Sequence, residues 1–188
     1  DSINCGYEVV QGFRDTKNIC DNWLSTSYAI LYYLQSLFIN KSRFNFGMSS
    51  FLNGTGFMVK KETIDRYGYD PKTITEDIEY TAICAINGIK IAFNENAITY
   101  DEQVTDFKSS LKQRKRWSFG AIQCLKNYTG SLIKEGIKNK RFECFDVVIF
   151  YFGIIFYVLF TIVSLIVIFY NVFYLNDFNS MDVVIYFI

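Results

Sequence analysis

The fold class follows from residues 73–93, which read TITEDIEYTAICAINGIKIAF. Thr73 and Glu76 have the spacing of a capping box, and Thr75 is an alternative N-cap, so either choice starts a helix here. Apolar residues then recur on one face, and Gly88 fits the position just past the helix end. The apolar run after this glycine predicts a strand. The order helix, glycine, strand is typical of an α/β domain.

Short strands are predicted around this unit. Residues 7–12 form a β-branched run that ends at a glycine, and residues 90–93 and 97–100 form two further strands. Residues 13–18 are charged and predict a connection. Residues 40–45 are polar and basic, which predicts a loop.

A helix is predicted to begin after Asp21 or Asn22, because either residue can cap it. Residues 27–39 of this helix are uncharged, but they are too few to span a bilayer, which takes about 20 residues. The favoured interpretation is a buried core helix. The alternative is a helix at the membrane interface, with its tyrosines at the level of the headgroups.

Composition limits the chemistry of the chain. Its 188 residues suffice for one domain with appendages. It contains no histidine, so proton transfer near neutral pH would use carboxylates, cysteines, tyrosines or lysines. The 19 basic and 19 acidic residues give a net charge of zero, so we expect no nucleic-acid partner.

The cysteines are odd in number and have no C-x-x-C spacing. Without histidine, a zinc site would need three or four of these scattered thiols to converge. We therefore expect reduced thiols that pack as small apolar groups. They are Cys5, Cys20, Cys84, Cys124 and Cys144.

The apolar excess lies in the last part of the chain. Residues 147–175 carry no charge and would reach roughly 43 Å as a helix, enough for a hydrocarbon core about 30 Å thick. Basic residues precede this run and acidic residues follow it, which places the globular part in the cytoplasm. A loop at 176–182 leads into a second apolar run from Val183. These patterns predict a multi-pass protein of the cell membrane.

The chain is expected to divide into four parts. We assign residues 1–128 to the globular domain, 129–146 to an amphipathic interfacial linker, and 147–175 to a transmembrane helix. Residues 176–188 form a loop and the start of a truncated second span. Both ends look cut, so we expect an internal fragment of a longer membrane protein.

Two short stretches carry side chains suited to chemistry. In the stretch Thr75, Glu76 and Asp77, the two acids place carboxylates in a first helical turn, where the dipole and free N–H groups favour the ionised form. Ordinary helix chemistry explains such acids equally well. Residues 112–117 (KQRKRW) carry four cations before Trp117. A solvated helix face is the ordinary interpretation, but arginine forks suit phosphate oxygens and an indole suits stacking on a sugar ring.

A third stretch is rich in glycine. Residues 51–59 (FLNGTGFMV) form a strand-like run in which Gly54 and Gly56 flank Thr55. Glycine in a strand marks a bulge or a close approach to the backbone. A simple bulge and a site where a substrate lies against bare peptide groups remain open alternatives.

Four motifs precede the membrane segments in a fixed order: VQG at 10–12, GTG at 54–56, TED at 75–77 and Q-x-x-R-W at 113–117. With these motifs the chain resembles the C-terminal half of a membrane-embedded family-2 glycosyltransferase of the cellulose, chitin and hyaluronan synthase kind. The resemblance covers roughly residues 7–175. It implies the second half of a GT-A-like α/β domain, the nucleotide-diphospho-sugar transferase fold, followed by transmembrane α-helices.

The resemblance also implies roles for the motif residues. Asp77 would be the general base that takes a proton from the acceptor hydroxyl, and Thr75 and Glu76 would position it. The glycine motif would line the acceptor site, and the later motif would bind the nucleotide pyrophosphate and the acceptor sugar. These expected substrate-binding residues are Gly54, Thr55, Gly56, Gln113, Arg114, Arg116 and Trp117.

Enzymes of this kind hold Mg²⁺ or Mn²⁺ with a D-x-D motif and bind uridine with further aspartates. Neither feature is visible here, so we expect the metal ligands upstream of this chain and none within it. The cut would then fall inside the catalytic domain, and the fragment alone is expected to be inactive.

The activity implied by the resemblance is an inverting transfer at the cytoplasmic membrane face. A nucleotide-diphosphate sugar, expected to be UDP-linked, would give its sugar to a hydroxyl of a saccharide or glycan acceptor. One alternative is a transferase that charges a lipid phosphate with a single sugar. Another is a non-catalytic membrane anchor or transport subunit.

Overall fold

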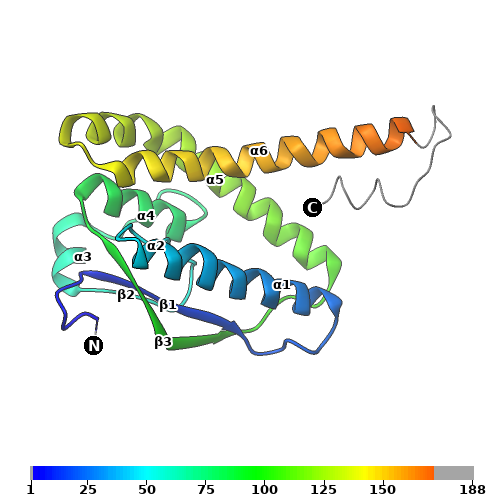
Figure 1. Cartoon of the computed structure of the whole chain (residues 1–188), viewed down its shortest axis with the longest axis horizontal. Coiled ribbons are helices and arrows are strands. Elements are labelled where there is room, and N and C mark those ends of the chain that lie inside the picture. Colours follow the sequence, from blue (N-terminus) through cyan, green and yellow to red (C-terminus); the bar gives the residue numbers. More distant parts are fainter. Residues whose placement is uncertain (1, 172–188) are drawn as a thin grey trace. The chain divides into compact units, whose positions relative to one another are not determined.

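The computed structural model describes residues 2–171, which form a mixed α/β fold around a three-stranded sheet in the order β2–β1–β3 (Figure 1). The central strand, β1 (Val9–Thr16), pairs antiparallel with β2 (Phe57–Val59) and parallel with β3 (Ile91–Asp101). A parallel pair needs a long crossover, and most of the helices lie within it. They are α1 (Trp23–Leu34), η1 (Gln35–Lys41), α2 (Ser42–Asn45), α3 (Lys61–Tyr67) and α4 (Glu76–Asn87).

The parallel pair β1–β3 carries a bulge at its middle. Gly12 is paired with Asn94, and the next residue, Phe13, is paired with Ile98. The two strands predicted at 90–93 and 97–100 are therefore one bulged strand. A Cβ on Gly12 would lie 2.9 Å from the carbonyl oxygen of Gly56 and would overlap the backbone at the bulge, so only glycine fits there.

The connection predicted at residues 13–18 is wrong, because β1 continues to Thr16. This strand contains two charged residues, Arg14 and Asp15. Arg14 is tolerated there because it forms an ion pair with Asp101 of β3 at 2.5 Å. The loop predicted at residues 40–45 is also wrong, because η1 and α2 cover it. There the polar Asn40 is fully buried, and its side chain accepts a hydrogen bond from the backbone N–H of Phe51 at 2.9 Å.

Helix α1 begins after Asn22, whose side chain caps it as expected. It packs along β1 (Figure 1). Leu24, Tyr28 and Tyr32 are buried, as the core-helix interpretation requires. The opposite face exposes large apolar side chains. They are Trp23, Ile30, Leu31, Tyr33 and Leu34.

Apolar clusters among the described residues join the elements of the domain, and two of them involve the sheet and α1. The first joins the sheet to α4 and contains Val9, Leu52, Tyr80, Cys84, Ile89 and Ile91. The second consists of Leu24, Tyr28 and Tyr32 of α1 with Val104 and Trp117 packed against it. Burial confirms apolar packing for Cys84, Cys124 and Cys144, but the same prediction is wrong for Cys5 and Cys20, which are exposed.

After the sheet the chain forms two long helices, α5 (Phe107–Asn139) and α6 (Phe142–Tyr170). The chain divides between Ile149 and Phe150 into two compact units. By length and composition alone, α6 is the one helix among residues 2–171 that is long and apolar enough to cross a membrane. The second span predicted from Val183 lies outside the described residues.

Candidate active site

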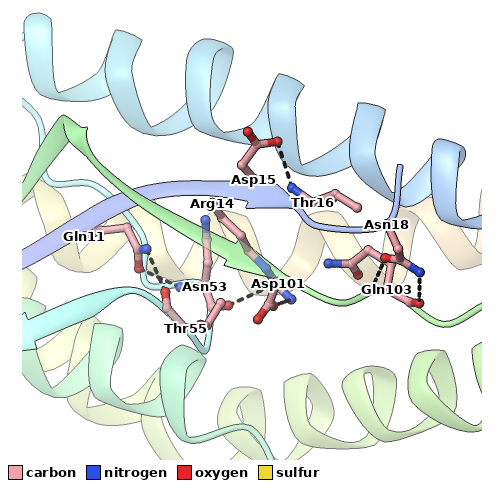
Figure 2. A network of polar contacts seen from close by, with 9 residues as sticks. All are labelled: Gln11, Arg14, Asp15, Thr16, Asn18, Asn53, Thr55, Asp101 and Gln103. Carbon is pink, nitrogen blue, oxygen red and sulfur yellow. Dashed lines mark hydrogen bonds and ion pairs between the residues drawn. The ribbon is translucent and has the colours of Figure 1, made fainter. Parts of the chain in front are cut away.

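A tight turn at residues 53–56 is held by the side chain of Gln11, which is fully buried in β1. The Gln11 amide donates to the carbonyl of Thr55 at 2.9 Å, and its oxygen accepts from the backbone N–H of Asn53 at 3.0 Å (Figure 2). The backbone N–H of Gly12 also donates to the Gly56 carbonyl at 2.8 Å. The glycine stretch is therefore a turn fixed on β1, and strand β2 starts only after it, at Phe57.

Arg14, three residues further along β1, contacts the same turn. Its Nη1 donates to the carbonyl of Asn53 at 2.9 Å, and its Nη2 pairs with Asp101 (Figure 2). The guanidinium also lies 3.6 Å from the centroid of the Tyr32 ring. Burial raises the pKa of Tyr32 to about 12, although the charge of Arg14 opposes this, so the phenol stays neutral at physiological pH.

The turn faces Asp77 at the start of α4. Gly54 has a φ of +73°, and a Cβ built on it would lie 3.1 Å from Oδ2 of Asp77. Gly56 has a φ of +64°, and its Cβ would lie 2.5 Å from Oγ1 of Thr99 on β3. The two glycines thus let bare backbone approach a carboxylate on one side and the sheet on the other.

Asp77 is half-buried, and burial raises the pKa of its carboxyl above the usual 3.8. The neighbouring charge of Glu76 also raises it, while the N–H of Ile78 and the charge of Arg14 lower it. The helix start was expected to favour the ionised form, but desolvation outweighs that effect here. A carboxylate with a raised pKa is a stronger base than an ordinary one.

Thr75 does not cap α4 with its side chain, although it occupies the N-cap position. The capping box predicted from Thr73 and Glu76 is also wrong, since the Thr73 hydroxyl donates to the carbonyl of Thr75 at 3.2 Å. Instead, the buried Thr75 packs on α5. A Cβ on Gly120 would lie 2.7 Å from Cβ of Thr75, and Cys124 Sγ lies 3.9 Å from its hydroxyl. Thr75 therefore fixes the start of α4 against α5.

Glu79 is a third acid of α4, and sequence reasoning gave it no role. It is only 1% exposed and accepts hydrogen bonds from the backbone N–H groups of Lys72 and Thr73 and from the Tyr128 hydroxyl. Burial alone would raise its pKa, but these donors hold the pKa below its usual 4.5. Glu79 is thus a satisfied structural carboxylate that orders the segment before α4.

The basic motif lies on α5. Trp117 is half-buried and meets the Tyr28 ring edge-on, with centroids 6.2 Å apart. Arg114 is exposed and lies 5.3 Å from the same ring, and Arg116 is also exposed. Among residues 2–171, the buried Oε1 of Gln113 has no hydrogen-bond partner.

The acidic motif at residues 75–77 and the basic motif at residues 113–117 are linked through intermediate residues. The start of α4 contacts α5 beyond Trp117, where the N–H of Ile74 donates to the side chain of Gln123 at 3.1 Å. On the other side, Tyr32 packs in the same cluster as Trp117, and its ionisation is linked to the charge of Asp77. The structure therefore brings Asp77 of the acidic motif next to the glycine turn, while Arg114 and Arg116 are exposed on α5.

Sequence reasoning missed the roles of Gln11, Arg14, Asn53 and Tyr32. A glutamine inside a β-branched strand and an Asn-Gly pair were the available signals for Gln11 and Asn53. Within the described part of the chain, no three side chains of Asp, Glu, Cys or His gather where they could hold a metal ion. The described residues therefore do not form a metal site, and we derive no step through one.

The motifs named above lie within the region of the chain that a family model matches. Residues 6–176 match the family model described as Glycosyl transferase family group 2. The chain is 25% identical over 160 residues to the probable glycosyltransferase YdaM of Bacillus subtilis (strain 168). That alignment covers 81% of this chain and 34% of the relative, so the chain spans about a third of the length of the curated relative it matches.

Proposed function

The chain belongs to glycosyl transferase family group 2, and from this premise we propose that it is part of an enzyme that transfers a sugar from a nucleotide-diphosphate sugar to a saccharide hydroxyl. The expected donor is UDP-linked, and the expected chemistry is an inverting displacement. In this proposal the fold corresponds to the C-terminal half of a GT-A-like domain.

The observation that carries the proposal is the position of Asp77 against the turn at residues 53–56. Such a transfer needs a base that removes the proton of the attacking hydroxyl. Asp77 combines a raised pKa with a neighbour, Gly54, that has no side chain to occupy the space before the carboxylate. An acceptor sugar that lies against this turn would present a hydroxyl to Asp77.

The leaving nucleotide diphosphate needs positive charge. Arg114 and Arg116 are exposed on α5, and arginine suits the oxygens of a diphosphate. Trp117 would contribute an aromatic surface for the acceptor sugar, and Gln113 would add a hydrogen bond. We assign the ligands of Mg²⁺ or Mn²⁺ to the upstream part of the full-length enzyme.

The apolar helix α6 supports a place at the cell membrane. We place the catalytic part in the cytoplasm because basic residues precede this helix in the sequence. The acceptor would then be extended at the inner membrane face. A lipid-linked product and a polysaccharide product both fit a membrane enzyme, so the assay has to separate them.

The test is a transfer assay with the full-length protein in membranes. Radiolabelled UDP-glucose, UDP-N-acetylglucosamine and GDP-mannose are supplied in turn with Mg²⁺ or Mn²⁺. We expect label from a UDP-sugar to appear in an ethanol-insoluble saccharide fraction. Label in the lipid extract would favour the lipid-phosphate transferase instead, and no transfer from any donor would contradict both assignments.

A further inference from the structure

We propose that Arg14 is a positioning residue that clamps the turn at residues 53–56 against Asp77. The inference rests on the proposed function for its catalytic consequence, but the clamp itself is a property of the fold.

Three hydrogen bonds hold Asn53. The Asn53 carbonyl accepts from Arg14 at 2.9 Å, and the Asn53 N–H donates to Gln11 at 3.0 Å. The side-chain oxygen of Asn53 accepts from Gln35 at 3.1 Å. Asn53 directly precedes Gly54, which faces Asp77. Fixing the peptide of Asn53 therefore fixes the surface that Asp77 meets.

Several contacts hold the Arg14 side chain in place, so it can position the turn. Its side chain is 11% exposed, pairs with Asp101 and lies over the Tyr32 ring, with Cζ 3.6 Å from the ring centroid. A planar guanidinium satisfies these directions together, whereas a lysine ammonium supplies the charge without the fork. The strand carries Arg14 where an apolar residue would pack more simply, which argues for a role beyond packing.

The charge of Arg14 also acts on Asp77. The ionisable groups that interact with Asp77 come from several elements: Glu76 of α4, Arg14 of β1, Tyr32 of α1, and Tyr69 in the segment before α4. Arg14 is the cation of this set. Because Arg14 is paired with Asp101, the negative charge of Asp101 offsets part of the electrostatic effect of Arg14 on Asp77.

Two substitutions separate these effects in the full-length protein. Arg14→Lys keeps the charge but loses the fork, and Arg14→Gln loses both. Thr16→Val is a matched control, because Thr16 is a buried residue of the same strand whose hydroxyl has no partner among residues 2–171. Lys17→Gln controls for removal of a cation, since Lys17 is exposed at the end of β1.

The first readout is amide hydrogen exchange, which needs no substrate. Both Arg14 variants should raise exchange in residues 51–57 by on the order of tenfold, while residues 91–93 of β3 and both controls keep the wild-type rate. Unchanged exchange in the turn, or an equal rise throughout the sheet, would overturn the clamp.

The second readout is the pH dependence of transfer from the UDP-sugar that the wild type uses. Arg14→Gln should move the acid limb to higher pH by a fraction of a unit, and Arg14→Lys should leave it in place. A limb that stays in place in Arg14→Gln would overturn the electrostatic role. If the wild type transfers no sugar, the proposed function fails, and hydrogen exchange alone still decides for or against the clamp.

Discussion

Gly54 lies against the carboxylate of Asp77: a Cβ on Gly54 would lie 3.1 Å from Oδ2 of Asp77. The contact joins the glycine turn to the first turn of α4, two stretches that the sequence separates by a strand and a helix. It explains why a turn that is otherwise held by Gln11 and Arg14 has glycine at this point. It also defines the surface on which we expect an acceptor hydroxyl to approach its base.

Replacement of Gly54 by alanine should impair transfer more than it impairs folding. Alanine at a φ of +73° costs about 1–2 kcal/mol, and its methyl group would press on Asp77. Gly47→Ala is the matched control, because Gly47 has a φ of +81° but nothing within 4 Å. Both variants should lose similar stability in denaturant unfolding, and only Gly54→Ala should lose most of its transfer rate. Similar transfer rates in the two variants would contradict a role for this contact.

Gly120→Ala should separate α4 from α5. The new methyl group would overlap Thr75, and such overpacking costs about 1–3 kcal/mol. Gly130→Ala on the same helix meets nothing within 4 Å and should instead gain up to about 1 kcal/mol. Unfolding midpoints in denaturant measure both effects. A Gly120→Ala protein as stable as Gly130→Ala would show that Thr75 does not fix the two helices.

Glu79 should make stability depend on pH on the acid side. Its pKa in the folded protein is held below 4.5, so its contribution is present above about pH 4.5 and is lost as pH falls through the folded-state pKa. Glu79→Gln should remove this part of the pH dependence. It should also lower the free energy of unfolding by about 1–3 kcal/mol at neutral pH, because the buried donors lose an ionised acceptor. Thermal unfolding between pH 3 and 7 measures it, and parallel curves for variant and wild type would argue against the assignment.

Trp117→Phe should reduce transfer to the acceptor more than it reduces hydrolysis of the donor. Phenylalanine keeps an aromatic contact with Tyr28 but presents a smaller surface to a sugar ring. Trp117→Ala is less informative, because loss of packing in this cluster costs about 3 kcal/mol as well. The ratio of transferred sugar to free sugar measures the effect. An equal loss of both products would count against stacking on the acceptor.

Local signals in the sequence were enough for part of this structure. Helix α4 and its end at Gly88 were predicted correctly, because apolar periodicity and a left-handed glycine act over a few residues. The start of α1 was predicted for the same reason, with Asp21 and Asn22 as alternative caps, and the structure shows Asn22. The mixed α/β class followed from the order of these elements.

Long-range pairing could not be predicted in this way. Arg14 and Asp15 looked like a loop because charges are unusual inside a strand, yet Asp101, 87 positions later, compensates Arg14. Thr75 looked like a cap, but its neighbours are Gly120 and Cys124 on α5. The dipole argument for Asp77 also missed the burial that raises its pKa. In each case the deciding partner or environment exists only in the folded chain.

The central claim is that Asp77 is the base for the acceptor hydroxyl, and Asp77→Asn in the full-length protein tests it most directly. Asp70→Asn is the control, because Asp70 is an exposed acid in the segment before α4. The rate of sugar transfer should fall by on the order of 10² or more in Asp77→Asn while UDP-sugar binding is retained, and it should stay at the wild-type level in Asp70→Asn. Wild-type transfer by Asp77→Asn would contradict the account.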